Sequence, residues 1–257
     1  MTRAKWTASI LILPILCVAA MALAAEPFRE EFDQTYNITA DGRISLENVN
    51  GNLVVSVWDR NAVRVQATKE ADTQEDLAKL RIEVANTASS VRIVTRMPER
   101  DGFFGQRHDH LSVEYTLTVP RSVSLDKLDL VNGGLTISGL AGNLRAELVN
   151  GSIKATALGG SIDLDTVNGT TELELDVLEV GQHVVLESVN GAVELRLPAA
   201  VSADIRAETV NGAISNDFGL EVTKHEHVGR ELSGAIGGGG ADVRLETVNG
   251  SIRLLKR

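Results

Sequence analysis

Seven acidic residues recur at one fixed spacing, each three residues before the Asn of a Val-Asn-Gly tripeptide. If the tripeptides stack on one another, these carboxylates form a file of like charges that repel one another unless cations intervene. Lys or Arg lies two residues before four of them, at Lys127, Arg145, Arg206 and Arg244. The pattern is typical of a solvated, salt-bridged face, and the alternative is a strip that binds Ca²⁺ or a cationic partner. The acidic residues are Glu47, Asp129, Glu147, Asp165, Glu187, Glu208 and Glu246.

Four of the five histidines form two short motifs, His108-Asp109-His110 and His225-Glu226-His227. In an extended segment, alternation places both histidines of a motif on one side, as a transition-metal site requires. Two ligands from one segment seldom hold zinc unaided. We interpret the motifs as exposed histidines in polar segments. A metal site remains the alternative if the two motifs meet in space.

The sequence contains no catalytic motif that we recognise. There is no Gly-x-Ser-x-Gly and no His-Glu-x-x-His, and the single cysteine, Cys17, lies in the apolar N-terminal segment. The carboxylates are periodic, and periodicity indicates architecture, whereas a catalytic pair would break the repeat. We therefore predict a protein that is not an enzyme and needs no cofactor.

The Val-Asn-Gly tripeptides that follow the acidic residues are the main repeat of the chain. The steps between them are 82, 18, 18, 22, 21 and 38 residues, and the last is close to two steps of 19. We therefore interpret Val228-Gly229 as a degraded repeat. Apolar and polar residues alternate on both sides of each tripeptide, which predicts two half-buried strands per repeat. The seven asparagines are Asn50, Asn132, Asn150, Asn168, Asn190, Asn211 and Asn249.

Two all-β architectures satisfy this pattern. Asn-Gly is a strong hairpin signal, which would give an antiparallel meander. We favour a β-solenoid (β-helix) with rungs of 18 to 22 residues and a Val-Asn-Gly corner in each rung. Stacked rungs place equivalent positions ~4.8 Å apart, which rewards the same residue at every corner and lets Asn side chains hydrogen-bond along the stack.

Three regions are expected along the chain. Residues 1–24 resemble a signal peptide, with Arg3 and Lys5 before an apolar run and a small-residue cleavage site before Ala25. Residues 25–122 are predicted to be a β-rich capping region with one short helix over 72–81. Residues 123–257 are predicted to hold the regular repeats, with a last strand over 251–255 at the open end of the stack.

Composition limits the partners. The formal net charge is −10, and loss of the leader with its two cations makes it −12. An acidic protein is a poor candidate for binding nucleic acid or an anionic membrane. We expect an exported protein, either periplasmic or at the cell surface, without a transmembrane segment once the leader is removed.

The repeated corners, together with ISLENVNGNLVVSVWDRNAVRV, YTLTVPRSVSLDKLDLVNG and GGGGADVRLETVNGSIRLLKR, resemble the bacterial putative-adhesin family of β-strand-repeat proteins of unknown function. The resemblance covers about residues 30–257 and implies an envelope-associated or secreted β-solenoid, with no catalytic residues to carry over. Our leading hypothesis is a structural or adhesin-like envelope protein that presents a repetitive β face to a protein or glycan. A carbohydrate-active enzyme on a β-helix and a metal-binding periplasmic module are the alternatives.

Overall fold

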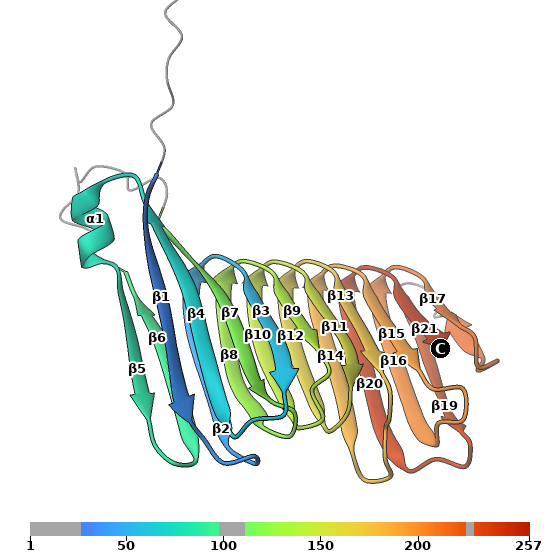
Figure 1. Cartoon of the computed structure of the whole chain (residues 1–257). Coiled ribbons are helices and arrows are strands. Elements are labelled where there is room, and N and C mark those ends of the chain that lie inside the picture. The colour runs from blue at the N-terminus through green and yellow to red at the C-terminus, as the bar shows by residue number, and fades with distance from the viewer. Residues whose placement is uncertain (1–26, 98–110, 225–228) are drawn as a thin grey trace, which may run out of the picture.

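The computed structural model describes residues 27–97, 111–224 and 229–257. They form 21 strands and one short helix, arranged as two large sheets that lie face to face (Figure 1). The ten-stranded sheet has the order β1 (Phe28–Asn37), β4 (Ala62–Ala71), β7 (Ser112–Pro120), β3 (Leu53–Trp58), β9 (Leu135–Ser138), β11 (Ile153–Leu158), β13 (Thr171–Leu175), β15 (Val193–Leu197), β21 (Ile252–Lys256) and β17 (Ile214–Asn216).

The second sheet has eleven strands. Its order is β18 (Val222–Lys224), β19 (Arg230–Ile236), β16 (Ala203–Asn211), β20 (Ala241–Asn249), β14 (His183–Asn190), β12 (Ile162–Asn168), β10 (Leu144–Asn150), β8 (Ser124–Asn132), β2 (Arg43–Asn50), β6 (Ser90–Arg96) and β5 (Arg81–Asn86). No helix in the described ranges is long and apolar enough to cross a membrane.

The predicted β-solenoid was wrong. Instead of one closed coil, the chain forms two separate sheets of mixed topology. The middle strands of both sheets pair in parallel, but β4, β5 and β19 each pair antiparallel with a neighbour. Spatial order also departs from chain order at both ends of the eleven-stranded sheet, so the strands do not follow one regular winding. The alternative meander is absent from the repeat as well, because its neighbouring strands are parallel.

Alternation along the strands builds the core between the sheets. In β12, Ile162 and Leu164 are buried, whereas Asp163 between them is only half buried. The buried aliphatic side chains of both sheets form one continuous cluster. Because parallel strands carry the same pattern in register, each Leu or Ile rests on its equivalent in the next strand.

Each corner carries the chain from one sheet to the other. The Asn ends a strand of the eleven-stranded sheet, and the next strand, such as β13 after β12, belongs to the ten-stranded sheet. Successive corners approach so closely that a Cβ on Gly169 would lie 2.0 Å from the Gly151 carbonyl oxygen. Gly169 also has φ +147°, which a side chain would strain. The invariant Gly is therefore required by stacking, and no hairpin turn is involved.

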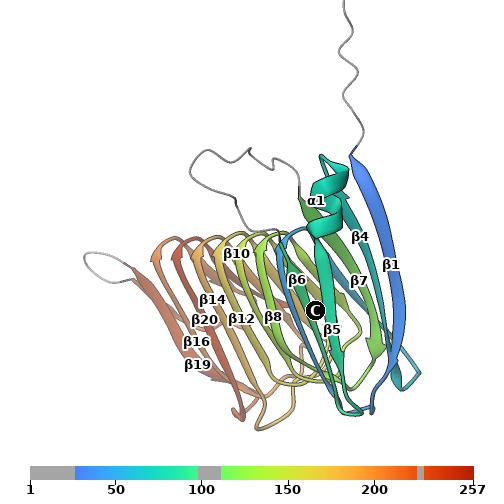
Figure 2. The same ribbon diagram turned by 90° about the vertical axis from the view of Figure 1, so that its left-hand side faces the viewer.

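The N-terminal part of the described chain covers one end of the sheets. The short helix α1 (Gln74–Lys79) begins at Thr73, whose hydroxyl accepts the Asp76 amide N–H, as an N-cap does. It lies next to β4 and β1, and the end view in Figure 2 shows it above β5 and β6. The buried Lys69 of β4 links these elements, because its Nζ lies 2.8 Å from the Glu30 carboxylate and donates to the Leu80 carbonyl oxygen.

The C-terminal part of the chain does not lie at the end of the sheets. β20 lies between β14 and β16, and β21 lies between β15 and β17. The step of 38 residues therefore marks a chain that passes outward, turns through β18 and β19, and returns. Our interpretation of residues 228–229 as a degraded repeat was wrong, because β19 runs antiparallel to β16 in that place. Val228 itself lies outside the described residues.

Candidate functional site

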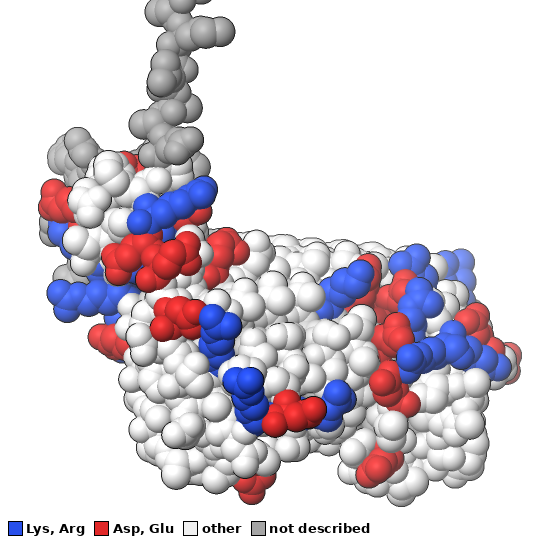
Figure 3. All heavy atoms as spheres, viewed as in Figure 1, with Lys and Arg blue, Asp and Glu red and all other residues white. Residues whose placement is uncertain are grey.

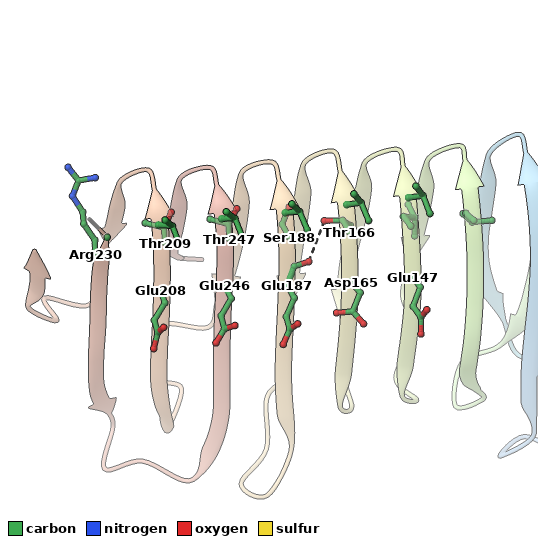
Figure 4. Close-up of a pocket in the computed structure, with 18 of the residues that line it drawn as sticks. Glu147, Asp165, Thr166, Glu187, Ser188, Glu208, Thr209, Arg230, Glu246 and Thr247 are labelled. Atoms are coloured by element: carbon green, nitrogen blue, oxygen red, sulfur yellow. Dashed lines mark hydrogen bonds between the residues drawn. The ribbon is translucent and has the colours of Figure 1, made fainter. Parts of the chain in front are cut away.

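A groove crosses the outer face of the eleven-stranded sheet. It has a volume of about 770 Å³ and runs over β8, β10, β12, β14, β20 and β16 to β19. On six of these strands its lining consists of the same three positions, the acidic residue, the following residue and the valine of each repeat. Figure 4 shows the carboxylates of neighbouring strands side by side, with the residues nearer the corner in a second row. The groove is thus a direct product of the repeat.

One wall of the groove is a row of exposed valines. Valines are normally placed inside, but alternation turns the residue before each Asn outward, together with the acidic residue two positions earlier. The six that line the groove are 39% to 47% exposed. We call them the valine row: Val131, Val149, Val167, Val189, Val210 and Val248.

The other wall is the file of carboxylates. The strands place all seven predicted residues in one register, so that Glu47 stands opposite Asp129 and Glu246 stands opposite Glu208. The remaining pairs between them follow the same register. Six of the seven line the groove, and Glu47 on β2 lies beyond its end.

Cations compensate the file near its two ends. Lys127 Nζ lies 2.7 Å from the Asp129 carboxylate, and Arg206 lies 2.6 Å from that of Glu208. Arg145 and Arg244 make equivalent contacts with Glu147 and Glu246, at 3.6 and 2.6 Å, and Arg92 of β6 reaches Glu47 at 2.9 Å. Outside the centre, the salt-bridged face that the sequence indicated is therefore present in the described structure.

The centre of the file has a different charge balance. Asp165 on β12 and Glu187 on β14 stand opposite each other, and the residues two positions earlier are Asp163 and Val185 instead of cations. Among described residues, neither carboxylate has a cation within salt-bridge distance. Burial is the main cause that raises the pKa of Asp165, and Glu147 and Asp163 raise it further, while Arg145 lowers it. The two central carboxylates thus lack the ion pair that the other groove carboxylates have, and Arg145 and Arg244 of the adjacent strands act on them only at longer range.

The residues between the acidic residues and the valines turn their side chains inward, and on four strands these side chains carry buried hydroxyls. Thr166, Thr209 and Thr247 each donate to a backbone carbonyl oxygen of a neighbouring strand or corner. Ser188, at the same position of β14, is 6% exposed. Its hydroxyl makes no hydrogen bond within the described part of the chain.

The seven corner asparagines lie in a single file beside the groove. Six of them donate from Nδ2 to the Oδ1 of a neighbour at 2.8 to 3.0 Å, and Asn50 donates to the Leu111 carbonyl oxygen. The six bonds run from Asn132 to Asn50, Asn150 to Asn132, Asn168 to Asn150, Asn190 to Asn168, Asn249 to Asn190 and Asn211 to Asn249. The inversion at Asn249 and Asn211 follows the strand order. The file is a scaffold feature, because its amides bond to one another.

The histidine motifs lie outside the described residues, so the structure does not place His108, His110, His225 or His227. Within the described ranges, no three His, Cys, Asp or Glu side chains are grouped as metal ligands. His183 lies in β14, with Nε2 3.5 Å from the Asp163 carboxylate.

The valine row is the part of the candidate site that our sequence reasoning missed. Its signal was present, because a valine precedes Asn in all seven tripeptides. Alternation already placed the acidic residue outward, and the valine, two positions further along the strand, had to share that face.

No protein-family model and no curated protein sequence matches the chain. Among solved structures, it is similar to a putative cell adhesion protein from Clostridium sporogenes, with 15% identity and a TM-score of 0.53 over 90% of this chain and all of that one. Two further matches are putative adhesins. That from Bacteroides fragilis has 13% identity and a TM-score of 0.42, over 91% of this chain and 100% of that one. The putative adhesin from Parabacteroides merdae has 10% identity and a TM-score of 0.30, over 87% of this chain and 95% of that one. The first match shows a shared fold, so at that level the resemblance to the bacterial putative-adhesin family is confirmed.

Proposed function

We propose that this chain is an exported, adhesin-like envelope protein without enzymatic activity, which binds a protein or glycan partner through the groove of its eleven-stranded sheet. The observation that supports this proposal most directly is the valine row beside the carboxylate file. Contiguous exposed apolar side chains rimmed by polar groups mark interaction sites, because leaving them in water is unfavourable. The description of the Clostridium protein as a cell adhesion protein supports the same reading.

The groove favours binding over catalysis. Its carboxylates repeat from strand to strand and most hold a cation of their own strand. No aromatic side chain lines it in the described structure, whereas carbohydrate-active sites commonly combine a carboxylate pair with an aromatic platform. We further propose that residues 1–24 are removed on export. In this proposal residues 25–122 cap the repeats of 123–257, and the mature protein acts in the periplasm or at the cell surface.

The test is binding of the mature chain, residues 25–257, to envelope fractions of its own organism. We expect Val149→Ser with Val189→Ser to reduce the bound fraction several-fold, because the change removes the apolar wall at the groove's middle. Val54→Ser is the matched control, since Val54 is 41% exposed but lies on the ten-stranded sheet. Thermal melts establish that all variants fold.

Two outcomes would contradict the proposal. Equal binding by the groove variant and the control would show that another surface makes the contact. Release of reducing sugars from envelope glycans by the wild-type chain, lost in Asp165→Asn, would replace it with the carbohydrate-active alternative.

A further inference from the structure

We propose that the groove binds a linear aliphatic polyamine, with ammonium groups on Glu147, Asp165 and Glu187 and the methylene chain against the valine row. The inference rests on the proposed function, because both use this groove. It goes further by naming the chemistry that the groove recognises.

The groove is long and narrow. It crosses seven strands, and six spacings of ~4.8 Å give a length of about 29 Å. The carboxylate file and the valine row stand two residues apart along each strand, ~6.6 Å. A single unbranched chain without bulky side groups can lie between them, with one side against the carboxylates and the other against the valines.

The repeat distance of the carboxylates matches a propylene-linked amine. Adjacent carboxylates of the file stand in register on neighbouring strands, ~4.8 Å apart. Two amines joined by three methylenes are separated by four bonds of ~1.5 Å, which advance about 5 Å in an extended zigzag. One ammonium can therefore meet each strand. An extended peptide cannot, because side chains on one of its faces recur only every ~6.6 Å.

The charge of the groove fits a cation at its centre. Asp165 and Glu187 face each other there without a salt-bridged cation on their own strands. Glu147 has only a longer contact of 3.6 Å with Arg145, whereas Asp129 and Glu246 hold Lys127 and Arg244 at 2.7 and 2.6 Å. An ammonium between Asp165 and Glu187 would relieve the repulsion that in-register carboxylates impose.

The remaining groove-lining groups suit the same ligand. Val167 and Val189 stand on the same two strands as Asp165 and Glu187, two residues further along, so methylenes lying beside the carboxylates contact them. Apolar contact and ion pairing thus alternate along one linear molecule.

The test is calorimetric titration of the mature chain at neutral pH and low ionic strength with bis(3-aminopropyl)amine, a triamine with two three-carbon linkers. We expect it to bind about tenfold more tightly than trilysine, which has comparable charge on a bulkier backbone. Asp165→Asn with Glu187→Gln should weaken triamine binding about tenfold. Asp59→Asn with Glu172→Gln removes the same charge away from the groove and should leave the affinity within about twofold.

Four results would overturn the inference: no triamine binding, equal or tighter binding of trilysine, equal weakening by both double variants, or unchanged binding by Val149→Ser with Val189→Ser. The envelope assay separates the two proposals. If that valine variant loses envelope binding while the triamine fails to bind the wild-type chain, only the polyamine inference falls. If the valine variant behaves as wild type in both assays, both proposals fall.

Discussion

At the scale of single residues, the corner asparagines link neighbouring strands of the eleven-stranded sheet. An interior member such as Asn168 donates one amide hydrogen bond to Asn150 and accepts one from Asn190, at 2.9 and 3.0 Å. Amide ladders of this kind need equivalent positions at one-strand spacing, because only then do donor and acceptor meet at every step. The parallel register of the eleven-stranded sheet provides that spacing.

We expect Asn168→Ala to lower the free energy of unfolding by about 1–2 kcal/mol, because it removes two exposed hydrogen bonds worth about 0.5–1.5 kcal/mol each. Asn211→Ala is the control at the end of the file, where a single amide bond, to Asn249, is lost. It should cost about half as much. Urea denaturation of both variants measures the difference, and equal losses would mean that the ladder does not carry the effect.

Asp165 gives a prediction for pH. Its pKa is raised in the folded protein, mainly by burial, so folding disfavours its ionised form. Asp165→Asn, which keeps the neutral shape, should therefore be more stable than wild type at pH 7. The advantage should shrink as the pH falls through the raised pKa toward the ordinary value of 3.8, where the wild-type carboxyl becomes protonated.

The control for this measurement is Glu246→Gln. Its carboxylate lies 2.6 Å from Arg244 Nε, so neutralising it removes an ion pair and should bring no gain at pH 7. Thermal melts of the three proteins across the acidic range provide the comparison. A gain for Asp165→Asn that is the same at every pH would show that titration is not its cause.

At the scale of elements, the sequence predicts the strands well but not their order. Alternating burial and the corner signal place strands such as β12 and β13 where the structure has them, and charges with Leu77 and Leu80 predict the region of α1. The order fails because β16 and β20 read ADIRAETVN and ADVRLETVN. Strands with equivalent side chains can pair interchangeably, so the connection over residues 217–240 decides which is central. Nothing in the local pattern encodes that choice.

The same limit applies to the candidate site. The acidic file could be predicted because a fixed offset from Asn fixes both face and register. The groove could not be predicted, because its concavity depends on how the whole eleven-stranded sheet curves. The histidine motifs illustrate the reverse case. Their spacing allowed a metal site, but whether residues 108 and 225 meet depends on chain order, which the repeat does not specify.

β20 and β21 are inserted between other strands, which predicts that their backbone amides exchange with solvent more slowly than is usual near the end of a chain. β20 and β21 are bordered on both sides, and Val243, Leu245 and Ile252 are fully buried. Chain ends usually fray, but exchange of a backbone amide with solvent requires its hydrogen bond to open. We expect the amides of residues 241–254 to exchange as slowly as those of β12, and those of the edge strand β18 to exchange much faster. Hydrogen exchange followed by mass spectrometry measures this. Fast exchange at 241–254 would mean that the inserted pair opens independently.

At the scale of the whole molecule, the two sheets stay open and their outer strands must avoid pairing with other chains. Two of the four edge strands, β17 and β18, have three residues each, which gives a second chain little to pair with. β1 has ten residues and is mostly exposed. Figure 3 shows charged side chains gathered at the end that carries β1 and α1 and again at the opposite end. Charge at these ends opposes edge-to-edge growth.

The long edge strand β1 is therefore the place to test how the molecule avoids edge-to-edge pairing with other copies. β1 carries three carboxylates and one cation. Glu30 and Asp33 are paired with Lys69 and Arg64 of β4, whereas Glu31 has no cation partner among the described residues, so charged side chains line the edge that a second copy would meet. Glu31→Thr with Asp33→Thr removes two charges and places a strand-favouring residue at each position. We expect concentration-dependent association of this variant in sedimentation velocity, growing as the ionic strength rises. Asp59→Asn with Glu172→Gln changes the net charge equally but leaves β1 intact, and should sediment as wild type does. Only the edge strand offers unpaired backbone groups to a second chain, so the control should not associate. If it associates as readily, overall net charge controls assembly and the edge strand does not.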